Sequence, residues 1–182
     1  MGVVTMLEVK RQRFLVSADP ARETRNVRAF LAAPSLRLAG PADGVMSLPL
    51  RERIAALRVA LLDSGVTVYS SHHDEEWVSR EGTGPRVPSP FRAMQSADVV
   101  FAYVGQRPST GMGMELGWAT ALRKPVVLMV DEAKVHGVLI DQLESVTKVL
   151  PIKDDGPMTP SALRHTVVTA LDWADQAAPL AG

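Results

Sequence analysis

SADVVFAYVGQRPSTGMGMELGWATALRKPVVLMV, residues 96–130, contains the pattern that decides the fold of this chain. An apolar segment at residues 98–104 is followed by a glycine-rich loop, a helical segment that ends near residue 122, and a second apolar segment at residues 124–130. Both apolar segments lack polar alternation, which is typical of strands buried on both faces of a parallel sheet. The stretch therefore predicts a β–α–β unit.

The same alternation continues on both sides of this unit. We expect further strands at residues 27–34, 66–70 and 146–152, and further helices at residues 48–64, 91–97, 136–145 and 159–177. Gly65 is suited to end the first helix, and Thr159 followed by Pro160 is suited to begin the last. This order predicts an α/β domain with a parallel sheet covered on both sides, at residues 28–182, preceded by an extension at residues 1–27. Ligands of such sheets bind beyond the carboxyl ends of the strands.

Composition narrows the class of protein. The chain has 182 residues, of which 46% are hydrophobic and 22% charged, as expected for one globular domain. Lys plus Arg equals Asp plus Glu at 20 each, so the overall charge does not favour nucleic acid or an anionic membrane as a partner. Without cysteine there is no disulfide or thiolate nucleophile. No apolar run is long enough for a membrane span and the start lacks a signal-peptide pattern, so we expect a cytoplasmic protein.

The loop RPSTGMG, residues 107–113, follows an expected strand and opens a helix. Free N–H groups and the dipole of such a helix start favour an anion. The loop lacks the Gly-Lys-Ser/Thr of nucleoside triphosphate loops, and glycines 111, 113 and 117 do not have dinucleotide spacing. An ordinary glycine-rich start of a helix is the alternative interpretation.

Glu115 is the residue of this stretch that most favours chemistry. We expect it in the first turn of the helix, where an acid is commonly found because the helix dipole favours it. However, it lies between Met114 and Leu116 on a helix that we expect to pack on the sheet. A partly buried carboxylate beside an anion site favours a functional role.

SHHDEEW, residues 71–77, leaves the second strand and begins a loop of twenty residues, a length that is usually functional. His72, His73, Asp74, Glu75 and Glu76 suggest a metal at first sight, but consecutive side chains cannot all point at one centre. We therefore expect no metal, and favour base recognition or acid–base help by one or two of them. Trp77 is either a stacking wall or part of the core.

Several of these segments resemble one known family. They are RAFLAAPSLRLAGPADGVMS, VTVYSSHHDEEW, residues 96–130 and QLES, which together cover about residues 28–152. They resemble the nucleoside 2-deoxyribosyltransferase superfamily, and within it the nucleotide N-glycosidase branch. That branch includes cytidine monophosphate hydrolases of antibiotic biosynthesis and deoxynucleoside 5′-monophosphate N-hydrolases. The resemblance implies a five-stranded parallel, flavodoxin-like (Rossmann-like) three-layer sandwich, in agreement with the order of strands and helices above.

The resemblance also implies a mechanism and a site. Glu115 matches the glutamate that attacks the anomeric carbon of the sugar and forms a covalent glycosyl-enzyme. Ser109 and the backbone of Gly111, with Gly113 beside them, match the 5′-phosphate site. Ser145 matches a serine that reaches the phosphate from a neighbouring subunit, which implies a homodimer. No metal or organic cofactor is implied.

The chain departs from the family pattern at three places. Pro90 stands where an aspartate usually assists protonation of the leaving base, and nearby Arg92 or the acids at residues 74–76 are the candidates to replace it. Leu36 stands where the cytidylate hydrolases have an arginine that reads cytosine, with Arg37 next to it, so the base is left open. Phe30 replaces the tyrosine of the deoxynucleotide hydrolases, as in the cytidylate hydrolases, which favours a ribonucleotide.

Three functions remain as alternatives. The first is hydrolysis of a nucleoside 5′-monophosphate with the candidate binding residues Phe30, Arg37, His72, Asp74, Arg92, Ser109, Gly111, Gly113 and Ser145 around Glu115. The second is transfer of the sugar to another base, which would use the same nucleophile. The third is a nucleotide-binding or sensing domain, which the absent aspartate at residue 90 favours and the retained Glu115 opposes.

Overall fold

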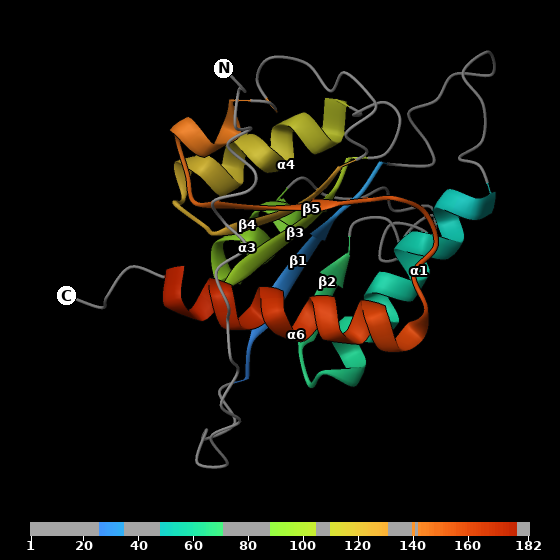
Figure 1. Cartoon of the computed structure of the whole chain (residues 1–182). Helices are drawn as coiled ribbons and strands as arrows, with labels where there is room; N and C mark the ends of the chain where they lie inside the picture. Colours follow the sequence, from blue (N-terminus) through green and yellow to red (C-terminus); the bar gives the residue numbers. More distant parts are fainter. Residues whose placement is uncertain are drawn as a thin grey trace, which may run out of the picture.

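The computed structural model describes residues 26–34, 48–70, 88–104, 110–130, 140 and 142–177. Within them, five parallel strands form one sheet (Figure 1): β1 (Arg28–Ala32), β2 (Thr67–Ser70), β3 (Val99–Tyr103), β4 (Val126–Val130) and β5 (Val149–Lys153). Their order in the sheet is β2-β1-β3-β4-β5, and Phe30 of β1 pairs with Tyr69 of β2 and Val100 of β3. This is the flavodoxin-like order, so the expected fold class is confirmed.

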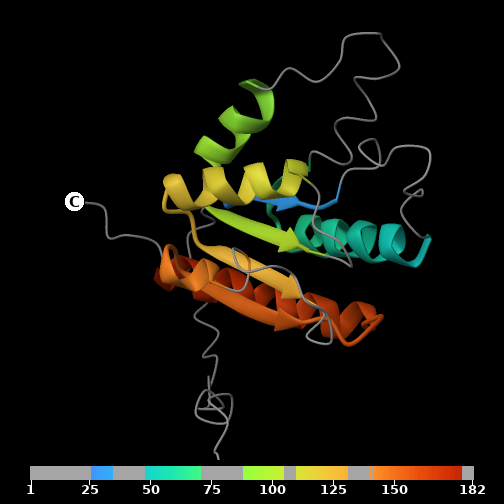
Figure 2. The ribbon, with the colours of Figure 1, turned by 90° about the horizontal axis from the view of Figure 1, so that it is seen from above.

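Helices cover both faces of the sheet, which gives three layers (Figures 1 and 2). On one face α1 (Leu48–Asp63) and α6 (Pro160–Ala177) bury Ile54, Leu57 and Val167 against the sheet. On the other face α3 (Pro88–Ser96) and α4 (Thr110–Ala121) bury Met94, Met112 and Leu116. Successive side chains of a strand point to opposite faces. Leu31, Phe101 and Met129 therefore join the first core, while Phe30, Val100 and Leu128 join the second.

Local signals fix the ends of the two long helices, as the sequence predicts. After α1, Gly65 takes a φ of +78°, a conformation that glycine adopts without steric cost, and its N–H donates to the Leu62 carbonyl at 3.0 Å. Before α6, the Thr159 hydroxyl accepts a hydrogen bond from the Ala162 N–H at 3.2 Å, and Pro160 occupies the first helical position.

Some expected boundaries differ from those observed. The helix expected at residues 91–97 is α3, which begins at Pro88, because the first turn of a helix needs no backbone N–H and tolerates proline. The last strand begins at Val149 and not at residue 146. Of the helix expected at residues 136–145, the structure describes residue 140, which is helical, and residues 142–145, which contain the short 3₁₀ turn η1 (Leu143–Ser145). Within the described residues, no helix has the length and apolar character required to cross a membrane.

Candidate active site

The strand order indicates that a ligand would bind at the carboxyl ends of β1 and β3. These two strands are neighbours, and the chain leaves them toward opposite faces of the sheet, to α1 and to α4. Such a switch point is where ligands of open parallel sheets bind. The expected site residues Arg37, His72, Asp74 and Ser109 lie outside the described residues, and their roles stay predictions.

Glu115 is confirmed as a buried carboxylate. The residue is only 8% exposed, and it lies on α4 beside the buried residues Met112 and Leu116. The helix begins at Thr110, so Glu115 lies in its second turn and the expected position in the first turn is wrong. The reason is that the glycines of the stretch are already helical. Because the helix dipole acts mainly on the first turn, it does not account for a carboxylate here.

The first turn of α4 offers the groups that an anion needs. Backbone N–H groups in the first turn of a helix have no carbonyl partner within that helix. In α4 these groups include the N–H groups of Thr110 and Gly111. Gly113 is exposed, and a Cβ built on it would meet no atom of the described residues within 4 Å. The backbone at Gly113 is therefore open to approach from outside, one turn from the start of the helix.

Two aromatic side chains lie on the face of the sheet that α3 and α4 cover. Phe30 of β1 is fully buried, and its ring centroid is 5.1 Å from that of the half-buried Tyr69 on β2. Both belong to the core between the sheet and helices α3 and α4. The structure thus places Phe30 on the same face as Glu115, but inside the core, and its contact with substrate stays a prediction.

Helix α3 is fixed against α4 by a ring contact. Phe91 meets Trp118 edge to face, with centroids 5.3 Å apart. Arg92, the next residue, is exposed on α3, and Pro90 lies in its first turn. Asp98, which directly precedes β3, lies at the amino-terminal edge of the sheet, where it accepts a hydrogen bond from the Arg28 N–H at 2.8 Å. Asp98 therefore has a structural contact away from the candidate site.

Ser145 ends the turn η1 on the α4 side of the sheet, since its neighbour Leu143 is buried in the core beneath α4. Ser145 itself is exposed, and its hydroxyl donates to the Gln142 carbonyl at 2.7 Å. Val146, which follows, is 65% exposed. Ser145 is therefore on the surface, where contact with a second subunit is possible.

Sequence reasoning missed one polar cluster. Arg53 of α1 donates to the Asp154 carboxylate at 2.8 Å and to the Tyr103 hydroxyl at 3.3 Å, and Tyr103 donates to the same Asp154 oxygen. Burial and the hydrogen bond to Asp154 raise the pKa of Tyr103 to about 12, and the bond to Tyr103 raises the pKa of Arg53. The sequence feature that could have indicated this cluster is the tyrosine at the end of an apolar strand.

Comparison with known proteins agrees with this architecture. The model of the nucleoside 2-deoxyribosyltransferase family matches residues 38–150. Among solved structures, BlsM is 26% identical with a TM-score of 0.65, over 86% of this chain and 98% of that one. The CMP N-glycosidase BcmB of Clostridium botulinum is 20% identical with a TM-score of 0.50, over 78% of this chain and 98% of that one, a likeness of fold. No curated protein matches the sequence.

Proposed function

The chain belongs to the nucleoside 2-deoxyribosyltransferase family, and from this premise we propose that it hydrolyses the N-glycosidic bond of a nucleoside 5′-monophosphate. The products are the free base and, from a ribonucleotide, ribose 5-phosphate. The observation that carries the proposal is the buried carboxylate of Glu115 on the helix that follows β3. Burying a carboxylate costs free energy, which favours a chemical role over a structural one.

In the proposed reaction, an oxygen of Glu115 attacks the anomeric carbon of the sugar. The bond from that carbon to the base nitrogen breaks, and its electron pair leaves with the base, which takes up a proton. Water then attacks the same carbon and releases Glu115, so that the sugar keeps its configuration after two inversions. All atoms come from the substrate, water and this carboxylate, and no cofactor is required.

The proposed phosphate site is the start of α4. The N–H groups of its first turn, together with Ser109, Gly111 and Gly113, would hold the 5′-phosphate about one helical turn from Glu115. The exposed Ser145 of a partner subunit would complete the site in a homodimer, as the family resemblance implies.

The departing base needs a group that neutralises its charge. The side chain at position 90 is a proline and has no proton to give. Arg92 is exposed on α3, but a guanidinium keeps its protons at neutral pH. It would therefore stabilise developing negative charge without acting as the acid. His72 and Asp74 are the proposed proton donors and readers of the base.

Transfer of the sugar to a second base is the other candidate, because the family that the chain belongs to is described as nucleoside 2-deoxyribosyltransferases. Both reactions share the glycosyl intermediate and differ in whether water or a base opens it. A reaction run with an added free base separates them. A new nucleotide containing that base would identify a transferase, and release of base alone would identify a hydrolase.

The test is base release from CMP, UMP, AMP, GMP and their deoxy forms, followed by chromatography. Glu115→Gln keeps the size of the side chain but removes the nucleophile. The matched control is Asp63→Asn, the same chemical change at an exposed carboxylate at the end of α1. We expect release from one monophosphate, at least about a thousandfold slower in Glu115→Gln and unchanged in Asp63→Asn. Equal rates for Glu115→Gln and the wild type would reject Glu115 as nucleophile.

A further inference from the structure

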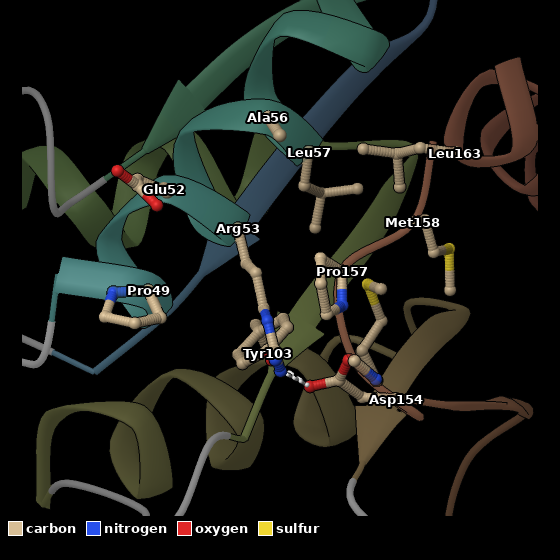
Figure 3. Close-up of a pocket in the computed structure, with 12 residues that line it drawn as sticks. Pro49, Glu52, Arg53, Ala56, Leu57, Tyr103, Asp154, Pro157, Met158 and Leu163 are labelled. Atoms are coloured by element: carbon tan, nitrogen blue, oxygen red, sulfur yellow. Dashed lines mark hydrogen bonds and ion pairs between the residues drawn. The ribbon is translucent and has the colours of Figure 1, made fainter. Parts of the chain in front are cut away.

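A pocket lies on the face of the sheet that is away from α4 (Figure 3). Its volume is about 270 Å³, and its walls come from α1, from the ends of β3 and β4, from the connection between β5 and α6, and from the first turn of α6. None of its lining residues belongs to α3 or α4. Tyr103 and Met129, which line it, point to the α1 and α6 side, so the sheet separates this pocket from Glu115.

We propose that this pocket binds a small, uncharged aromatic molecule of one or two rings. The proposal does not depend on the glycosidase reaction. It rests on three properties of the pocket, which are its neutral polar floor, its sulfur-containing walls and its size.

The polar floor is neutral as a unit. Arg53 and Asp154 form an ion pair at 2.8 Å, and the Asp154 side chain is only 8% exposed. Figure 3 shows the Arg53–Asp154 contact as a dashed line, and the Tyr103 hydroxyl donates to the same carboxylate. An anionic ligand would compete with Asp154 for the guanidinium, and Glu52 on the rim would repel it. An uncharged ligand leaves the ion pair intact and avoids the cost of a buried, unpaired charge.

The walls favour an aromatic ring. Met129 and Met158 both line the pocket, and thioether sulfur makes favourable contacts with the edges of aromatic rings. Leu57 and Leu163 supply aliphatic surface, and the planar guanidinium of Arg53, while paired with Asp154, can stack on the face of a ring. Pockets for drug-sized ligands range from about 300 to 1,000 Å³, so this one suits a smaller molecule.

The test uses the full chain with ¹³C-labelled methionine methyl groups and reads the signals of Met129 and Met158 by NMR. The probes are indole and indole-3-carboxylate, which differ by one negative charge, and adenine, an uncharged ring with several polar atoms. We expect indole to shift both methyl signals, and indole-3-carboxylate to bind at least tenfold more weakly. If adenine binds more tightly than indole, the occupant is a nucleobase-like ring, and if indole binds more tightly, it is a hydrocarbon-like ring.

Two tryptophan substitutions on α1 provide the control. Ala56 lines the pocket and is exposed, so Ala56→Trp fills it from the rim without disturbing the core. Val59 is 53% exposed on the same helix and does not line the pocket, so Val59→Trp should leave binding unchanged. Glu115→Gln should also bind indole normally. The proposal is overturned if no probe shifts the methyl signals, if Ala56→Trp still binds indole, or if the carboxylate binds as tightly as indole.

Discussion

Arg53 and Asp154 form an ion pair at 2.8 Å between the first turns of α1 and the end of β5. The two residues are 101 positions apart in the chain, and Tyr103, at the end of β3, donates a hydrogen bond to the same carboxylate. One cluster therefore ties three elements together at the carboxyl edge of the sheet. The candidate active site lies at this same edge, on the opposite face.

Removing Arg53 should destabilise the fold. Arg53→Met leaves the nearly buried Asp154 carboxylate without its cation, and we expect the free energy of unfolding to fall by about 2–3 kcal/mol. The comparison is Arg164→Met, which breaks the pair with Asp63 at 3.3 Å, whose side chains are 62% and 50% exposed. That loss should stay below about 1 kcal/mol. Urea unfolding measures the free energy of unfolding of both variants. Equal losses would mean that the Arg53–Asp154 pair stabilises the fold no more than an exposed ion pair does.

Tyr103 should make stability depend on alkaline pH. Burial raises its pKa in the folded protein to about 12, above the value of about 10 that is usual for tyrosine, so the unfolded chain loses this proton first as the pH rises. The contribution is therefore complete below pH 10 and is lost as the pH rises toward 12. The wild type should lose stability over that window more steeply than Tyr103→Phe. Unfolding at a series of pH values checks this, and parallel curves would contradict it.

Gly113 and Gly117 form a matched pair on α4. Among the residues that the structure describes, no atom lies within 4 Å of a Cβ built at either position, so alanine fits at both. Because alanine is the better helix former, each substitution should raise the free energy of unfolding by about 0.5–1 kcal/mol.

Only Gly113 lies near the proposed phosphate site. Gly113→Ala should raise KM about tenfold with little change in kcat, because the methyl group keeps the phosphate from the backbone. Gly117→Ala should leave KM unchanged. A KM for Gly113→Ala equal to that of Gly117→Ala would place the phosphate elsewhere.

Position 90 should control the departure of the base. Pro90→Asp puts a carboxyl group in the first turn of α3, where the helix dipole favours an acid. If the leaving base lies beside this turn, kcat should rise by about tenfold or more through general acid catalysis. Pro90→Asn makes the same backbone change without the acid and should not increase kcat. The pH profiles of kcat for the two variants measure the contribution of the acid, and identical profiles would refute this role.

Ser145 should act across a subunit interface. Ser145→Asp brings a negative charge to the proposed phosphate site of the partner and should abolish turnover, as Glu115→Gln does. In a mixture of the two variants that exchange subunits, mixed dimers contain one intact site, so activity should return to roughly a quarter of the wild-type value. Mass spectrometry verifies that the subunits have exchanged. If the mixed dimers then recover no activity, each site is built within one chain.

The sequence by itself determined the elements and their class. Buried strands such as β3 (Val99–Tyr103) are continuous apolar segments, and Gly65 and Thr159 mark helix ends through local backbone chemistry, so these features were predicted without knowledge of the fold. The burial of Glu115 was also predicted from its apolar neighbours, of which Leu116 is buried, whereas Met114 is 51% exposed and does not pack on the sheet.

Two features were decided only by the tertiary structure. Glu115 lies in the second turn of α4, and Arg53, Tyr103 and Asp154 meet in one hydrogen-bonded cluster. The start of α4 was uncertain because glycines are poor helix formers, and their propensity is overridden when the helix packs on the sheet. The cluster joins residues that are 50 and 101 positions apart. Periodicity reports only neighbours along one element, whereas the approach of separate strands and helices depends on how the whole sheet is assembled.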